Sequence, residues 1–291
     1  RFEEISGYSR DEVVGKNGFT LGMFENEDLN LLAERMKARL EGEPGRLLEM
    51  RFRRKDGGWM WVELVGNVIK KEGSPVGFQL FSRDITERVR MKEKLEALHR
   101  HSIQLSAAKT VDEVVNRTLD AMELTLGFNI GEFLMAENGY LRVRGWRGAQ
   151  ISILELPLDG PGITVKAAKT KGALCVPDTR KEPAYVDNKA VPTRGEDPST
   201  LSELAVPVLM DGKAVAVLNV ENVQLDAFTK DDQMLLETLA MHVASTLNRL
   251  RQVERLETVV EERTRRLRES EEKYRSLIRN IPDVTWTTDQ R

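Results

Sequence analysis

The sequence predicts an α+β protein in which two small mixed modules are connected and followed by long helices. Alternating apolar residues over 47–82 and again over 204–220 are typical of antiparallel strands. An amphipathic segment over 28–40 predicts a helix that precedes the first group of strands. A heptad repeat over 236–281, uninterrupted by Gly or Pro, is typical of a coiled-coil helix. Sheets and helices therefore occur in separate blocks, as in α+β folds.

Composition narrows the class of protein. The 291 residues suffice for about two domains, and a hydrophobic content of 40% with 31% charged residues is that of a globular chain. A net charge of −3 gives no electrostatic reason to expect nucleic-acid binding, and no apolar run is long enough for a membrane span. One cysteine excludes an internal disulfide framework and favours a reducing, cytoplasmic location. The chain starts at Arg1 without Met, so we expect a piece of a longer protein.

The first module is predicted to contain short helical pieces over 1–24, the helix over 28–40 and then a meander of strands. Turn signals separate the strands at Asp56-Gly57-Gly58 and Gly73-Ser74-Pro75. The predicted strands cover residues 47–54, 59–70 and 76–82.

Four stretches of this module resemble the later two-thirds of a PAS domain in order and spacing. They are residues 5–9 (ISGYS), 12–16 (EVVGK), 53–57 (RRKDG) and 84–88 (DITER). The resemblance implies a PAS domain over 1–88 whose N-terminal strands are missing. Flavin-binding PAS domains carry a reactive cysteine where this chain has Gly18, so a flavin adduct is excluded. No histidine lies in 1–88 to serve as an axial haem ligand, and we predict no cofactor and no metal.

The end of the third strand is a candidate point of signal transfer. Asp84 or Thr86 can cap the helix that begins there by accepting free backbone N–H groups. A change in the sheet would then alter the direction of a linker helix over 89–109. A plain cap with no signalling role is the alternative.

The second module is predicted over 110–249, although its first helix may be counted from near residue 95. A capping box at Thr110–Glu113 starts a helix that ends at Gly127. Strands are expected over 129–136, 140–146, 172–176, 204–210 and 213–220, with a short helix over 163–169 and a long loop over 178–201. This order resembles a GAF domain, with matching stretches such as Ala205–Val208 and Ala216–Val220.

Ligand-pocket candidates in this module are Trp146, Cys175 and Tyr185. The resemblance does not extend to the motif of cyclic-nucleotide-binding GAF domains, because Asn188-Lys189 is followed by Ala190. Cys175 has no neighbouring His for bilin attachment and no second cysteine for the disulfide exchange of methionine-sulfoxide-reducing relatives. Our default for Cys175 is a buried hydrophobic residue. Trp146 and Tyr185 either line a pocket or pack in the core.

The long helix is predicted to form a parallel homodimer through residues such as Leu250, Val260 and Leu267. Residues 250–281 would be a coiled-coil signalling helix, with a solvated single helix as the alternative. Residues 282–291 resemble the start of a second PAS domain.

We therefore expect the sensory and relay region of a cytoplasmic signalling protein, which by resemblance is a sensor histidine kinase of a two-component system. Binding of an unknown small molecule or partner to the PAS or GAF module would be transmitted along dimeric helices. The alternative is a dimerisation scaffold that binds nothing small. We expect no nucleic-acid or membrane contact. We also expect no enzyme, because no nucleophile–base pair, metal cluster, phosphoacceptor-histidine motif or ATP-binding motif is evident.

Overall fold

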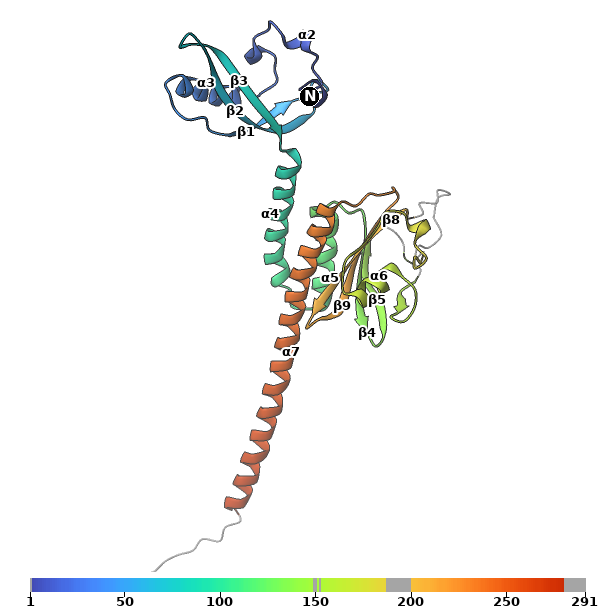
Figure 1. Cartoon of the computed structure of the whole chain (residues 1–291). Coiled ribbons are helices and arrows are strands. Elements are labelled where there is room, and N and C mark those ends of the chain that lie inside the picture. The colour runs from blue at the N-terminus through green and yellow to red at the C-terminus, as the bar shows by residue number, and fades with distance from the viewer. Residues whose placement is uncertain (1, 149–150, 152, 187–199, 280–291) are drawn as a thin grey trace, which may run out of the picture. The chain divides into compact units, whose positions relative to one another are not determined.

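The computed structural model describes residues 2–148, 151, 153–186 and 200–279, in two compact units, Arg1–Glu96 and Ala97–Arg291. Each unit contains an antiparallel sheet accompanied by helices, which confirms the predicted α+β class (Figure 1). The predicted start of a second PAS domain, 282–291, lies outside the described residues. Within those residues, no helix is long and apolar enough to cross a membrane.

The N-terminal unit consists of short helices followed by a three-stranded meander of order β1-β2-β3. Its helices are α1 (Phe2–Ser6), α2 (Arg10–Val13), the 3₁₀ turn η1 (Gly18–Thr20) and α3 (Asn26–Leu40). Its strands are β1 (Leu48–Arg53), β2 (Trp59–Lys71) and β3 (Ser74–Asp84). These bounds lie within a few residues of the predicted ones.

One face of this sheet forms the core of the N-terminal unit. The pairs Met50–Val62 and Phe52–Met60 lie opposite each other on β1 and β2, and all four side chains are buried. Leu32 of α3 packs in the same cluster. The period-2 alternation of the strands therefore positions the apolar side chains against the helix.

The C-terminal unit has a six-stranded sheet of order β6-β5-β4-β9-β8-β7. Its strands are β4 (Ile130–Glu137), β5 (Tyr140–Arg147), β6 (Glu155–Pro157), β7 (Leu174–Val176), β8 (Ser202–Met210) and β9 (Lys213–Asn222). Its helices are α5 (Val111–Asp120), the π-helical turn η2 (Ala121–Thr125), α6 (Ile163–Thr170), the 3₁₀ turn η3 (Thr179–Lys181) and α7 (Lys230–Arg279). Helix α4 (Thr86–Ser106) begins before the boundary between the units and ends after it.

Helices cover both faces of this second sheet. Helix α6 packs on the face that carries Leu134, Ala205 and Val217. Because strand residues alternate, Leu204 and Leu218 lie on the opposite face, toward α5 and α7. The figure shows α6 and α5 on opposite sides of the strands (Figure 1).

Helix α7 has two halves with different environments. It begins after Thr229, whose side chain and backbone N–H both bond to the Asp232 carboxylate. Leu236, Leu239 and Val243 are fully buried within the unit. The whole helix has 50 residues and is roughly 75 Å long. Every residue from 251 to 276 is exposed. The long helix predicted from the heptads is thus present, and it begins at Lys230, directly after Thr229.

Candidate functional site

The C-terminal unit buries a set of charged side chains on the sheet face that α6 covers. Glu132, Glu203 and Glu221 are 6%, 4% and 8% exposed, and Asn219 is 2% exposed. We call these four residues the acidic cluster. No Lys, Arg or His among the described residues is buried. Three carboxyl groups and one amide are therefore the buried polar groups of these strands on this face.

Strand pairing brings the four residues together. Glu132 of β4 lies opposite Asn219 of β9, and Glu203 of β8 lies opposite Glu221 of β9. Asn219 and Glu221 are two residues apart on one strand, so they point to the same face. Adjacent strands are about 4.8 Å apart. The three carboxylates thus occupy neighbouring positions on three adjacent strands.

Hydrogen bonds tie part of the acidic cluster to the loop that precedes β8. The Thr200 hydroxyl donates to the Glu221 carboxylate, and the Thr179 hydroxyl donates to the Thr200 carbonyl. The Asn219 Nδ2 donates to Glu221 Oε1 at 3.5 Å. The Asn219 Oδ1 atom is buried and has no hydrogen-bond partner among the described residues. A buried acceptor without a donor costs free energy, so this atom is suited to receive an N–H group from a ligand.

None of the three carboxylates in the acidic cluster is without a partner. Within the cluster, the atom that lacks a hydrogen bond among the described residues is Asn219 Oδ1. A group that donates an N–H to this oxygen would complete its hydrogen bonding.

The three predicted pocket residues do not share one location. Trp146 of β5 lies opposite Glu132 in the strand register, so both point to the same face, and Trp146 is 39% exposed. Tyr185 is half-buried and packs against the core beneath α6. Cys175 of β7 pairs with Leu204, so it faces the opposite side of the sheet from Glu203. Trp146 and Tyr185 are thus on the side of the acidic cluster, and Cys175 is not.

Cys175 is exposed, in contrast to the buried position expected by default. Its thiol Sγ lies 3.9 Å from the Phe228 carbonyl oxygen. Neighbouring protein atoms displace part of the water around the Sγ atom, and this desolvation raises the pKa of the thiol. The carboxylates of Asp226 and Asp232 raise it further because they would repel a thiolate. The thiol form is therefore favoured at neutral pH.

The predicted signal-transfer residues at the start of α4 are hydrogen-bonded to the sheet. The Asp84 carboxylate accepts the Thr86 N–H at 2.9 Å and lies 3.5 Å from the Arg54 guanidinium. The Thr86 hydroxyl accepts the backbone N–H of Trp61 at 2.9 Å. Both side chains therefore connect the first turn of α4 to the meander, as a cap coupled to the sheet requires.

The other predicted signal-transfer residues lie on α7. Leu250 is half-buried at the end of the packed half, whereas Val260 and Leu267 are 61% and 65% exposed. Val253 and Tyr274 continue the same heptad row and are exposed as well. Apolar side chains at this spacing form an uncovered stripe along the second half of the helix.

Sequence analysis missed the acidic cluster for an identifiable reason. The predicted strands began at Leu204 and ended at Val220, one residue inside Glu203 and Glu221. Polar residues also interrupt the apolar alternation at Glu132 and Asn219. Polar side chains on consecutive inward positions of neighbouring strands are the signal that would have found the site.

Family profiles match both units. Residues 1–81 match the profile described as PAS fold, and residues 108–248 match the profile described as GAF domain. These matches confirm the two resemblances drawn from the motifs.

Curated relatives match over shorter stretches. The bacterioopsin transcriptional activator of Halobacterium salinarum is 33% identical over 97 residues, 33% of this chain and 14% of that protein. The free methionine-R-sulfoxide reductase of Saccharomyces cerevisiae is 33% identical over 82 residues, 28% of this chain and 41% of that protein. The chain thus spans less than half the length of either relative.

A solved structure of free methionine-R-sulfoxide reductase from Neisseria meningitidis, in complex with its substrate, has the same fold as the C-terminal unit. The TM-score is 0.50 at 19% identity, covering 56% of this chain and 93% of that one. The expectation that the chain is not an enzyme is contradicted by these similarities, because enzymes are among its relatives by sequence and by fold. That expectation rested on the lack of a nucleophile–base pair, a metal cluster and kinase motifs, and on the single cysteine.

The environment of Cys175 predicts its reactivity. Because the raised pKa disfavours the thiolate, alkylation by iodoacetamide near neutral pH should be slower than for a free cysteine. The change Asp226→Asn removes one of the repelling charges and should speed the reaction at a fixed pH. The measurement is the alkylation rate followed by mass spectrometry between about pH 7 and pH 10.

The matched control is Asp231→Asn, which removes a neighbouring charge that does not act on the thiol. Equal acceleration by both variants, or a wild-type thiol that titrates below its ordinary pKa, would contradict this account.

Proposed function

We propose that this chain, which carries a PAS fold and a GAF domain, is the sensory and relay region of a signalling protein. We also propose that its GAF domain binds a small molecule through a protonated amine group of that molecule. The observation that carries the ligand class is the buried Asn219 Oδ1 atom, which lacks a donor among the described residues and belongs to a side chain hydrogen-bonded to the Glu221 carboxylate. The PAS and GAF matches support the sensory role.

A free amino acid or a comparable small amine is the ligand class that fits best. An ammonium group can donate to a carboxylate and to the Asn219 oxygen at once. The similarity to a yeast enzyme named for a free amino-acid derivative, methionine-R-sulfoxide, supports the same class.

The path of the signal that we propose uses the helices that leave each domain. Helix α4 starts at the hydrogen-bonded cap of Asp84 and Thr86. Helix α7 packs against β8, the strand that carries Glu203, before its second half becomes exposed. A ligand that shifts β8 would bias the position of α7, and the helix would carry that change onward.

We also propose that two copies pair in parallel through the second half of α7. The heptad row of Val253, Val260, Leu267 and Tyr274 is exposed on a helix that nothing in the described chain covers there. An isolated helix gains little stability in water without packing of its apolar face. A second copy supplies an identical stripe in register.

The wider setting follows the resemblance and the composition. A sensor histidine kinase of a two-component system is the parent that we propose, with the similarity to a transcriptional activator as a competing indication. One cysteine in 291 residues fits a reducing compartment, so we propose a cytoplasmic location. A dimerisation scaffold that binds nothing small is the alternative to a ligand sensor.

The ligand class predicts a specific pattern of binding. L-Methionine should bind in calorimetry, and N-acetyl-L-methionine, which lacks the ammonium charge, should bind at least about tenfold more weakly. The change Glu221→Gln should weaken the binding of L-methionine by about 10- to 100-fold, since a charge-assisted hydrogen bond contributes about 1.5–3 kcal/mol. The side-chain amide oxygen can still accept the Thr200 hydroxyl, and the substitution then removes the 3.5 Å bond from Asn219 Nδ2.

Glu155→Gln is the matched control, because Glu155 lies on β6 and pairs with Arg142 at the surface. This variant should bind L-methionine with the same affinity as the wild type. If no free amino acid or small amine binds, the proposed ligand class is wrong and the result favours the dimerisation scaffold.

The dimer proposal predicts that Val260→Glu with Leu267→Glu yields a monomer, because four carboxylates would face one another across the seam of a parallel pair. Multi-angle light scattering measures the molar mass. Thr258→Glu, at an exposed position outside the heptad row, is the control and should stay dimeric. A double variant that remains dimeric would show that the stripe is not the interface.

Reduction of an oxidised amino acid by the GAF domain is a second candidate function, favoured by the 33% identity to the yeast reductase. Sulfoxide reduction needs two electrons, which dithiothreitol can supply. Formation of methionine from free methionine-R-sulfoxide, dependent on this protein and abolished by Cys175→Ser, would establish it. Failure to form methionine above the dithiothreitol background would remove it.

A further inference from the structure

Four buried side-chain atoms have no hydrogen-bond partner among the described residues. They are Arg35 Nε, Arg142 Nε, Asn219 Oδ1 and His242 Nδ1. A buried polar atom without a partner is destabilising, so each of these atoms needs an explanation. Asn219 belongs to the acidic cluster, and Arg142 Nε lies 3.1 Å from the Glu155 carboxylate in an ion pair. Arg35 and His242 remain to be explained.

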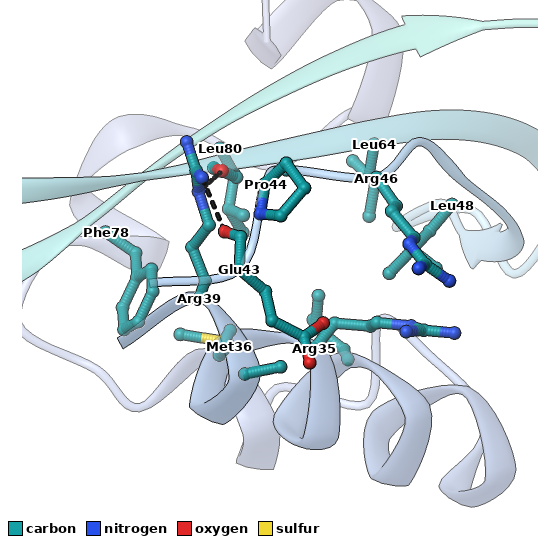
Figure 2. Close-up of a pocket in the computed structure, with 14 residues that line it drawn as sticks. Arg35, Met36, Arg39, Glu43, Pro44, Arg46, Leu48, Leu64, Phe78 and Leu80 are labelled. Carbon is teal, nitrogen blue, oxygen red and sulfur yellow. Dashed lines mark hydrogen bonds between the residues drawn. The ribbon is translucent and has the colours of Figure 1, made fainter. Parts of the chain in front are cut away.

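Arg35 lines a small pocket between the C-terminal half of α3, the following loop and strands β2 and β3 (Figure 2). The pocket has a volume of about 30 Å³, which is room for about one water molecule. A water molecule there can supply an acceptor for the Arg35 N–H, so this atom does not require a larger ligand.

His242 of α7 lies close to the last turns of α4. The imidazole of His99, on α4, is near enough for its charge to act on His242. Leu98 and Leu105 of α4 are 1% and 0% exposed, so these turns are packed within the C-terminal unit. The third histidine of the chain, His101, lies on the same turns. All the histidines of this chain therefore gather where α4 meets the GAF domain.

Hydrogen bonds from two helices fix the end of α4. The His101 Nε2–H donates to the Arg117 carbonyl oxygen of α5 at 2.6 Å. The Arg117 guanidinium donates to the Gln104 carbonyl oxygen, and the Arg249 guanidinium of α7 donates to the Ala108 carbonyl oxygen. The last carbonyl groups of a helix have no partner within it, so these donors stabilise the end of α4 and the turn after it.

Protonation of His242 would oppose this contact. A protonated imidazole carries an N–H on both ring nitrogens, and the buried Nδ1–H would have no acceptor among the described residues. Burial lowers the pKa of His242, and the charge of His99 lowers it further. The other charged groups of this contact, Arg117 of α5 and Arg249 of α7, are bonded to backbone carbonyls. No carboxylate of the described residues acts on His242.

We propose that His99 and His242 form a pH-sensitive latch, which holds the last turns of α4 on the GAF domain at neutral pH and releases them on acidification. Two imidazoles can also ligate a metal ion. In the part of the chain that the structure describes, however, no group of three or more His, Cys, Asp or Glu side chains could hold one. The proton is therefore the ligand that we assign to this pair.

The direction of the pH effect follows from His242. In the released helix its pKa returns toward the ordinary value of about 6.5, so the released form binds the proton more tightly than the packed form. The stability that the latch contributes is therefore present above about pH 6.5 and is lost as the pH falls through the lowered pKa.

The latch would regulate the relay through α4. This helix begins at the cap of Asp84 and Thr86 and ends in the contact with α5 and α7. Release of its last turns would free it from the GAF domain. The latch needs no small molecule, so its test is independent of the proposed amine ligand.

Hydrogen–deuterium exchange of the whole chain, followed by mass spectrometry, tests the proposal. The protection factor divides the intrinsic exchange rate by the observed rate and so corrects for the effect of pH on exchange itself. For residues 97–108 it should fall about threefold to tenfold between about pH 7.5 and about pH 5.5, since one unit of pKa change corresponds to a tenfold change in an equilibrium. The amides of β9 should keep their protection.

Three variants separate the latch from other effects. His242→Gln should remove the pH dependence, and His99→Gln should reduce it, because the burial of His242 remains. His99 is exposed, so its variant tests the proposal even if His242→Gln destabilises the domain. His101→Gln is the matched control. It loses the bond to the Arg117 carbonyl and should lower the protection of α4 at both pH values while keeping the pH dependence.

Equal protection of residues 97–108 at both pH values in the wild type would overturn the proposal. An undiminished pH dependence in both His242→Gln and His99→Gln would do the same. A loss of protection in acid that is equally large in β9 would show general unfolding and would also overturn it.

Discussion

The alternation of side chains along β8 and β9 is the constraint on which the C-terminal unit depends. Leu204 and Leu218 face α5 and α7, while Glu203 and Asn219 face the side of α6. A one-residue slip of register would exchange these two sets of side chains and bury the carboxylates against α5 and α7. The same pairing that builds the core therefore positions the acidic cluster.

Helix α7 depends on that core and also extends beyond it. Leu239 is buried by the sheet, and Val260, three heptads further along the same row, is exposed. One sequence pattern thus serves as core in the first half of the helix and as an unpaired stripe in the second. With the second copy that we propose on the stripe, one rigid helix would have two packing partners, and a change of packing at one end would be carried along it.

Each unit is joined to a helix by specific contacts. The Thr86 hydroxyl at the start of α4 accepts the Trp61 N–H of β2, and α7 packs on β8. The acidic cluster lies on the face of the second sheet opposite to the one that α7 covers. We propose that a change in either sheet is passed to the helix that contacts it.

The sequence by itself determined the elements and the two families, because periodicity, turns and caps are local properties that survive in one dimension. Thr86, Val260 and Leu267 were predicted as signal-transfer residues in this way. Only the tertiary structure decided the acidic cluster, because Glu132, Glu203 and Glu221 come from strands that are distant in the chain and meet through register. It likewise decided that Cys175 faces away from Glu203, and that the Arg35 Nε atom is buried without a partner among the described residues. Proximity and burial depend on how strands and helices pack, and no local pattern encodes them.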